Sequence, residues 1–205
     1  MKTQAPTLEL PDVKAWAAWL RAHHASSAAV FLRIEKKNAS TLTYATALEV
    51  ALAWGWIDGQ KAALDDTAWL QRFSRRTAKS PWSKVNRAKA EALISSGQMQ
   101  PAGLAEVQRA KADGRWERAY DSAKTATVPE DLAAALAKKP RARAFFDALD
   151  SANRFAILYR VTTAKRAETR TERIEKFVAM CAAGQTLFPP KKAKKKPAPR
   201  ERSDA

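Results

Sequence analysis

Residues 56–73 read WIDGQKAALDDTAWLQRF, two partly apolar runs with a polar centre between them. Runs of this kind on either side of a turn are typical of antiparallel strands. Asp65 and Asp66 occupy the centre, where an aspartate side chain can hydrogen-bond to its own backbone and stabilise a turn. The stretch therefore predicts a hairpin, and it favours turn chemistry over acid–base catalysis for these two carboxylates.

The residues before this hairpin predict one more strand and two helices. AVFLRIEKK, from Ala29 to Lys37, alternates and is rich in branched and aromatic residues, which favours a strand. Pro11 opens a first predicted helix, and Thr43 caps a second helix that stops at Gly55. The front half of the chain therefore predicts a small antiparallel sheet with helices.

From Ser80 onward the sequence predicts only helices. Ser80 as N-cap and Pro81 at the first helical position begin a helix that runs to Gly97. In the last predicted helix, Ile174, Phe177, Val178 and Cys181 recur at the spacing of one apolar helix face. The fold class is therefore α+β, with a compact helical C-terminal half. The further helices are expected at 101–113, 116–122, 129–139, 141–149, 151–164 and 167–183.

The chain ends in PPKKAKKKPAPRERSDA, with seven basic and two acidic residues and no apolar residue larger than alanine. Such a segment cannot offset the entropy of ordering, so we expect it to be disordered. It is either a solubilising end or a non-specific contact for phosphate groups. The predicted organisation is an α+β region over 1–96, a helical region over 97–186 and a disordered Lys-rich tail over 187–205.

The formal net charge of +16 is unevenly distributed along the chain. Residues 1–70 hold equal numbers of basic and acidic residues, whereas residues 71–90 hold seven basic residues and no acidic one. A polyanionic partner should therefore meet the 71–90 stretch and the tail.

The segment 69–89, WLQRFSRRTAKSPWSKVNRAK, interleaves three aromatic residues with these cations. Arginine can fork onto phosphate, aromatic rings can stack on bases, and a helix N-terminus attracts anions. The pattern leaves a second interpretation open, in which the aromatic rings face the core, the cations face solvent and Ser80 only caps a helix. The predicted polyanion-binding residues are Arg72, Arg75, Arg76, Lys79, Ser80, Trp82, Ser83, Lys84, Asn86 and Arg87.

No motif for cofactor or metal chemistry is present in the sequence. The six glycines form no phosphate-binding loop, and no nucleophile turn of the Gly-x-Ser-x-Gly type occurs. His23 and His24 are adjacent, so on a helix they cannot share a metal. We therefore expect no cofactor, no metal and no catalytic residue. An enzymatic alternative would have only Asp58, Lys61 and Asp65 as participants.

The sequence also predicts a location. The single cysteine, Cys181, excludes an internal disulfide and fits a reducing compartment, and its spacing places it in the core. The N-terminus lacks the apolar run of a signal peptide, and no stretch approaches about 18 consecutive apolar residues. We therefore expect a cytoplasmic protein without membrane insertion.

Three motifs carry a family resemblance. AWGWIDGQKAALDDTAWLQRFSRR (53–76), SPWSKVN (80–86) and TAKRAETRTERIEKF (163–177) resemble the bacterial YdeI/OmpD-associated family, whose members are also called bacteriocin-protection proteins. The resemblance extends over roughly residues 8–185 and leaves out the tail. It implies a YjbR/CyaY-like α+β fold for the front half. It also implies a role in envelope stress or antimicrobial-peptide resistance, and it transfers no catalytic residue.

Two functions remain open at this point. The first is non-catalytic binding of nucleic acid or another polyanion through the predicted residues, which agrees with DNA-binding descriptions of some YjbR-like proteins. The second is stress protection through a protein partner, with the helical half as docking surface and Arg166, Arg170 and Arg173 exposed on the last helix. The first requires Trp82, Arg75 and Asn86 to converge at the surface.

Overall fold

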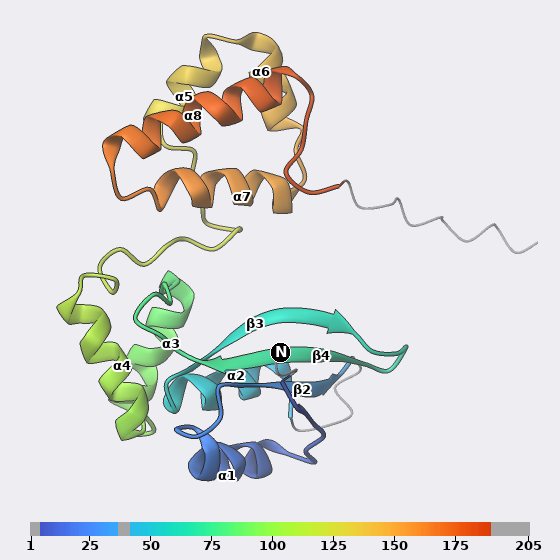
Figure 1. Cartoon of the computed structure of the whole chain (residues 1–205), viewed down its shortest axis with the longest axis vertical. Coiled ribbons are helices and arrows are strands. Elements are labelled where there is room, and N and C mark those ends of the chain that lie inside the picture. Colours follow the sequence, from blue (N-terminus) through green and yellow to red (C-terminus); the bar gives the residue numbers. More distant parts are fainter. Residues whose placement is uncertain (1–4, 37–41, 190–205) are drawn as a thin grey trace, which may run out of the picture. The chain divides into compact units, whose positions relative to one another are not determined.

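The computed structural model describes residues 5–36 and 42–189, and the chain divides into two compact units, Met1–Ser122 and Ala123–Ala205 (Figure 1). Within the described residues, all strands belong to unit 1 and unit 2 is helical. The α+β fold class is confirmed. Residues 190–205, most of the predicted disordered tail, lie outside the described ranges. No helix in the described part is both long and apolar enough to cross a membrane.

The sheet of unit 1 has the strand order β1-β2-β4-β3. The predicted hairpin is confirmed as β3 (Trp56–Ala63) and β4 (Ala68–Arg75), which pair antiparallel. Strand β2 (Ala29–Glu35) pairs antiparallel with the other side of β4. The two-residue β1 (Thr7–Leu8), which the sequence did not predict, adds one short parallel pairing to β2.

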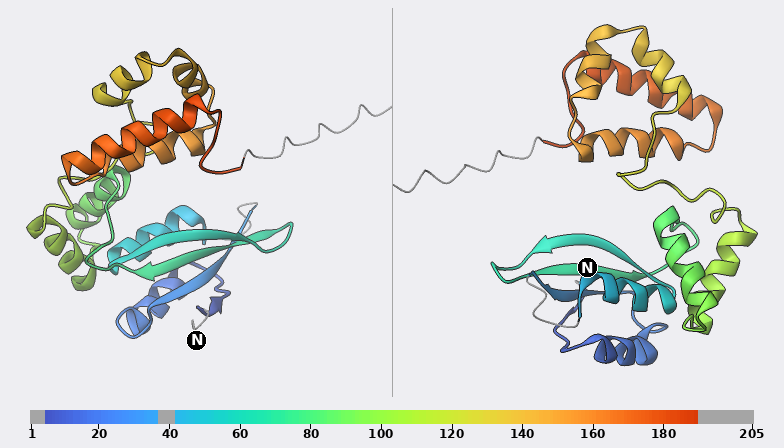
Figure 2. Two further views of the ribbon diagram at one scale, coloured as in Figure 1. Left: turned by 45° about the horizontal axis from the view of Figure 1, so that its top comes forward. Right: turned by 180° about the vertical axis from the view of Figure 1, so that it is seen from behind.

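Helices α1 (Val13–His23) and α2 (Tyr44–Ala53) lie on one face of this sheet, as Figure 2 shows. The first helix begins two residues after Pro11, because the side chain of Asp12 accepts a hydrogen bond from the Ala15 N–H at 2.8 Å and caps it. Thr43 caps α2 as predicted, and Gly55 ends it with a positive φ of 74°.

Aromatic rings fill the space between the helices and the sheet. The ring of Trp16 lies 5.5 Å from that of Phe73 and 6.4 Å from that of Trp56, measured between centroids. The indole N–H groups of Trp16 and Trp56 donate to backbone carbonyls, so these large side chains are buried without loss of hydrogen bonds. Unit 1 is therefore built around a tryptophan-rich core.

The helix expected from Ser80 begins later, as α3 (Lys84–Ser95), and its N-cap is Ser83. The delay has a tertiary cause. Residues Trp82 to Lys84 form a bridge with Tyr120, in which the Tyr120 N–H donates to Trp82 and the Lys84 N–H donates to Tyr120. This pairing holds the backbone extended up to Ser83. It also explains why the short helix expected at 116–122 does not form.

Helix α4 (Pro101–Ala112) belongs to unit 1, so the domain boundary expected at 96/97 is displaced to 122/123. Its Gly103 approaches the end of α2 so closely that an added Cβ would lie 2.2 Å from the Ala53 carbonyl oxygen. Val107 and Ala110 of α4 join the same core as the sheet. The chain therefore cannot divide between α3 and α4 without opening this core.

Unit 2 consists of α5 (Glu130–Ala137), α6 (Pro140–Asp147), α7 (Ser151–Thr162) and α8 (Ala167–Ala182). The apolar face predicted for the last helix is buried as expected. Burial raises the pKa of the Cys181 thiol, in agreement with a core role. The buried Asn153 side chain exchanges two hydrogen bonds with the backbone of Phe188 and fixes the last described segment onto α7.

The arginines expected to be exposed on α8 have internal roles instead. Arg170 forms two hydrogen bonds with the Asp131 carboxylate, at 2.6 and 2.9 Å, and donates to the Val161 carbonyl oxygen. Hydrogen bonding to Arg170 holds the pKa of Asp131 below its usual value. Arg173 donates to the Arg160 carbonyl oxygen. Both are half-buried because they join α8 to α5 and α7, and of the three arginines only Arg166, the N-cap of α8, is exposed as predicted.

The close approach at Gly103 predicts that Gly103→Ala destabilises unit 1. Alanine favours a helix interior over glycine by about 1 kcal/mol, but the added methyl group collides with the Ala53 carbonyl and should cost about 1–3 kcal/mol net. Urea unfolding followed by tryptophan fluorescence measures this, because all seven tryptophans lie in unit 1. The exposed control Ala105→Gly should lose about 1 kcal/mol. A Gly103→Ala protein with unchanged or greater stability would contradict the tight packing of α2 on α4.

Candidate functional site

The predicted polyanion-binding residues do not form one surface. They fall into three groups, which are buried, paired with carboxylates, or at least partly exposed without an ion pair. Arg76, Trp82, Ser83 and Asn86 are buried. Lys84 and Arg87 form ion pairs. Arg75 and Lys79 are exposed, and Arg72 and Ser80 are half-buried.

Trp82 is part of the core and cannot stack on a base. Only 2% of its surface is exposed, and its ring packs edge-on against Trp116 with centroids 4.8 Å apart. Asn86 is also buried, whereas Arg75 is exposed and donates to the Ala25 carbonyl oxygen. The expectation that Trp82, Arg75 and Asn86 converge at the surface is therefore wrong. The physical reason is the large apolar area that a tryptophan removes from water.

Arg76 is the most unusual residue of the segment. It is 3% exposed, its guanidinium lies 3.5 Å above the Trp82 ring, and its Nη1 donates to the Pro81 carbonyl oxygen at 3.1 Å. Burial lowers the pKa of Arg76 to about 10, and the charge of Glu106 opposes this shift. The side chain is still a cation at neutral pH. Arg75 and Arg76 are adjacent in the sequence, and nothing in the sequence shows that Arg76 is buried while Arg75 is exposed.

Much of the local charge is neutralised by acids from elsewhere in the chain. Lys84 lies 2.9 Å from Asp121 and Lys89 lies 2.5 Å from Glu49. Arg87 pairs with Glu91 one helical turn away, at 3.4 Å. The 71–90 segment contains no acidic residue of its own, but the fold brings carboxylates from other parts of the chain beside it.

Cations without an ion pair are found at several places in the described residues, for example at Lys165 and Arg166, and two of these places are β4 with the loop after it and the connection from α5 to α6. In the described residues, Arg72, Arg75 and Lys79 form no ion pair, and Arg72 and Arg75 are three positions apart on β4 and lie on opposite faces of the strand. The second place was missed by the sequence analysis. Lys138, Lys139 and Arg141, at the connection from α5 to α6, are all exposed and are unpaired within the described part of the chain. The feature of the sequence that indicates this group of cations is the run KKPRAR at 138–143.

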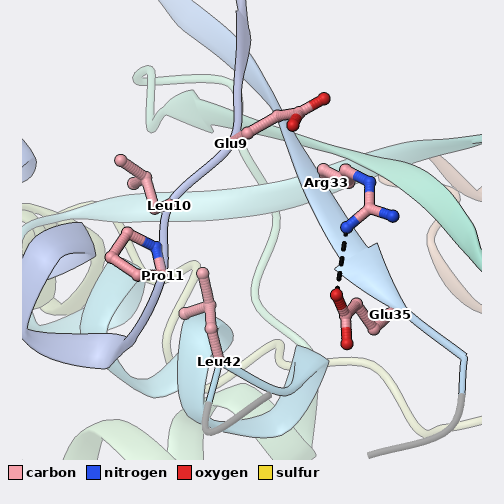
Figure 3. Close-up of a pocket in the computed structure, with 6 residues that line it drawn as sticks. All are labelled: Glu9, Leu10, Pro11, Arg33, Glu35 and Leu42. Atoms are coloured by element: carbon pink, nitrogen blue, oxygen red, sulfur yellow. Dashed lines mark hydrogen bonds and ion pairs between the residues drawn. The ribbon is translucent and has the colours of Figure 1, made fainter. Parts of the chain in front are cut away.

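A cavity of about 350 Å³ opens at the edge of the sheet near β1 and β2 (Figure 3). One side is polar, and there Arg33 forms an ion pair with Glu35 at 3.1 Å. None of the predicted site residues lines this cavity. Its walls are Glu9, Leu10, Pro11, Arg33, Glu35 and Leu42. No cluster of metal-ligating side chains occurs among the residues that the structure describes.

The residues of the enzymatic alternative have structural partners. Asp65 accepts hydrogen bonds from Thr67 and from the Ala68 N–H, which lowers its pKa and confirms the turn interpretation. Asp58 accepts a hydrogen bond from the Tyr44 hydroxyl at 2.8 Å. Lys61 lies over the Trp69 ring at 4.1 Å. The three side chains are thus engaged with different partners.

The burial of Trp82 predicts that Trp82→Ala destabilises unit 1 by about 3–5 kcal/mol, because it leaves a cavity and removes the ring beneath Arg76. Urea unfolding followed by the remaining tryptophans measures the loss. Val85→Ala, at an exposed position on α3, is the control and should change stability by less than about 0.5 kcal/mol. Equal stability of the Trp82→Ala and wild-type proteins would contradict the core position.

Two family models match separate parts of the chain. Residues 8–106 match a family described as a domain of unknown function (DUF8412). Residues 125–184 match the family described as bacteriocin-protection, YdeI or OmpD-associated. No curated protein and no solved structure matches the chain.

The two matches refine the resemblance seen in the sequence. The motif at 163–177 lies inside the YdeI/OmpD-associated match, whereas the motifs at 53–76 and 80–86 lie inside the match to the domain of unknown function. No match supports a YjbR/CyaY-like superfamily for the front half. The bacteriocin-protection, YdeI or OmpD-associated family is therefore the family that the helical region 125–184 resembles.

Proposed function

We propose that this protein is a non-catalytic cytoplasmic protein that binds nucleic acid through exposed cations at the start of α6. The observation that carries the proposal is the group Lys138, Lys139 and Arg141, which we call the α6 surface. These three cations lie within four positions, are exposed, and form no ion pair among the described residues. The nearby Asp147 already pairs with Arg143 and Arg154.

The helix end at this surface supports the same partner. Helix α6 begins with Pro140 and has no side-chain cap, so no side chain occupies the N–H groups of its first turn. The positive end of the helix dipole points out of this turn. Three cations beside an uncapped helix start are suited to a phosphate group.

The stretch around β4 is the weaker contact. Arg72 and Arg75 lie on opposite faces of the strand, so they cannot both face one duplex with Lys79. The Lys-rich residues 190–205 supply further positive charge by composition. Contacts of this kind read phosphate rather than base sequence, so we expect binding that depends strongly on salt and little on sequence.

The test is a titration of the full chain with labelled duplex DNA at several salt concentrations, read by fluorescence anisotropy. We expect a log–log salt slope of about −0.9 for each phosphate contact on duplex DNA. Exchanging Lys138, Lys139 and Arg141 together for glutamine should make the slope less steep by about 2–3. A shortened chain without residues 190–205 measures the part of the slope that the tail supplies.

Two matched variants control this experiment. Exchanging Arg72, Arg75 and Lys79 for glutamine removes the same charge and should have the smaller effect. Lys89→Gln removes a cation that is already paired with Glu49, and it should leave the slope unchanged. Absence of binding at low salt, or an unchanged slope in the α6-surface variant, would refute the proposal.

A second candidate function is protection against a bacteriocin or envelope stress through a protein partner. The observation in its favour is the description of the family that residues 125–184 match. Because Arg170 and Arg173 hold unit 2 together, a docking surface on α8 would use Arg166 instead. Deletion of the gene should raise sensitivity to cationic peptides, and the wild-type chain should restore resistance while Arg166→Glu should not. Unchanged sensitivity after deletion would remove this candidate.

A further inference from the structure

The sheet of unit 1 has one face that α1 and α2 do not cover. These helices lie on the other face (Figure 2), where Val30, Leu32 and Phe73 are buried in the core. Successive side chains of a strand point to opposite faces, so the residues that alternate with these three point away from the core. We call this side the outer sheet face. It consists of Phe31, Arg33, Leu70 and Arg72, together with Gly59 and Ala62 of β3.

Two apolar side chains and two guanidinium groups alternate on the outer sheet face. Phe31 of β2 lies directly opposite Arg72 of β4, and Arg33 lies directly opposite Leu70. Side chains that are opposite each other on neighbouring strands are close enough to interact. Phe31 and Leu70 are half-buried, and among the described residues neither packs against the core cluster of unit 1. Each of these apolar side chains therefore has a guanidinium group beside it.

Small residues border this group on the β3 side. Ala62 is opposite Leu70, and Gly59 lies at the β-bulge beside Arg72. A Cβ added at Gly59 would lie 3.6 Å from the Arg72 Nη1 atom. Both small residues are exposed. Because neither has a side chain larger than a methyl group, a flat ligand can lie across β3 and reach Arg72 and Phe31.

The two arginines differ in the charge that they leave free. Arg33 forms an ion pair with Glu35 at 3.1 Å, and its Nη2 also donates to the Thr67 hydroxyl. Arg72 forms no ion pair within the described part of the chain. A negatively charged group is therefore attracted to the Arg72 end of the outer sheet face, where the positive charge is not neutralised.

We propose that the outer sheet face binds one unpaired nucleotide of a single-stranded nucleic acid. The base stacks on Phe31 and packs against Leu70, and Arg72 binds a phosphate group of the same strand. The bases of a duplex are already stacked on their neighbours, so a duplex cannot make this contact. The site lies entirely in unit 1 and goes beyond the proposed duplex contact, because it does not rest on the α6 surface.

The size of the outer sheet face favours a nucleotide over a protein as the occupant. A stable protein interface buries about 1,200–2,000 Å² and has an apolar centre. The outer sheet face offers only two large apolar side chains, and both have a guanidinium group beside them. One aromatic ring next to one free guanidinium instead matches the base and the phosphate of a single nucleotide.

The experiment titrates the full chain with a fluorescently labelled oligothymidylate of about 8 nucleotides and reads the anisotropy. Phe31→Ala should weaken binding by about 5- to 150-fold, because it removes the ring on which one base stacks. Phe31→Tyr keeps the ring and should bind like wild type. Arg72→Gln should make the log–log salt slope less steep by about 0.7, the value for one phosphate contact on a single strand.

Controls show whether these effects belong to the outer sheet face. Arg75→Gln removes the same charge from the opposite face of β4 and should leave the slope unchanged. The affinity of Phe31→Ala for duplex DNA should equal that of wild type, since a duplex does not reach the ring. Tryptophan fluorescence in urea shows whether each variant is folded, and Arg72→Gln decides the matter if Phe31→Ala does not fold.

The result is separable from that for the α6 surface. When Phe31→Ala is added to the triple α6-surface variant, it should still weaken oligothymidylate binding by the same factor. Absence of oligothymidylate binding at low salt, or an affinity that Phe31→Ala leaves unchanged, would overturn the proposal even if duplex DNA binds at the α6 surface. A dimer that light scattering detects without nucleic acid and that Phe31→Ala abolishes would also overturn it, because a second copy of the chain would then occupy this face.

Discussion

The stacking of Arg76 on Trp82 is the contact on which the arrangement of unit 1 depends. Arg76 follows β4 directly, and its backbone N–H donates to Gly55 at the end of α2. Its side chain reaches the loop before α3, while Trp82 beneath it packs against Trp116 beyond α4. One stacked pair therefore joins the sheet to the helices that follow, and a desolvated cation over an indole ring contributes about 2 kcal/mol.

This contact also changes how the basic segment must be interpreted. A run of cations favours polyanion binding only if the cations are free, and here the fold buries one and pairs three with acids. Part of the unpaired charge lies instead at the start of α6, to which the sequence analysis gave less weight. Coulomb interactions depend on the distance between charges in space. The number of charges along a chain is therefore a better guide to the sign of a partner's charge than to the place where the partner binds.

Much of the fold was predictable because its signals are local. The caps at Thr43 and Gly55, the hairpin turn at Asp65 and the apolar face of α8 each arise from neighbouring residues. The start of α3 was not predictable, because the bridge to Tyr120 comes from far along the chain. The domain boundary was missed for the same reason, since only the packed structure shows how closely Gly103 approaches Ala53.

The sequence by itself determined the α+β class, the order of the three longer strands and of most helices, the strong positive charge and the resemblance of the helical region to the bacteriocin-protection, YdeI or OmpD-associated family. Only the tertiary structure decided which cations are free, that Trp82 is core, and that Arg76 is buried over the Trp82 ring. The physical reason is that propensity and periodicity act over a few residues. Burial and ion pairing are set by residues that meet only when the chain has folded.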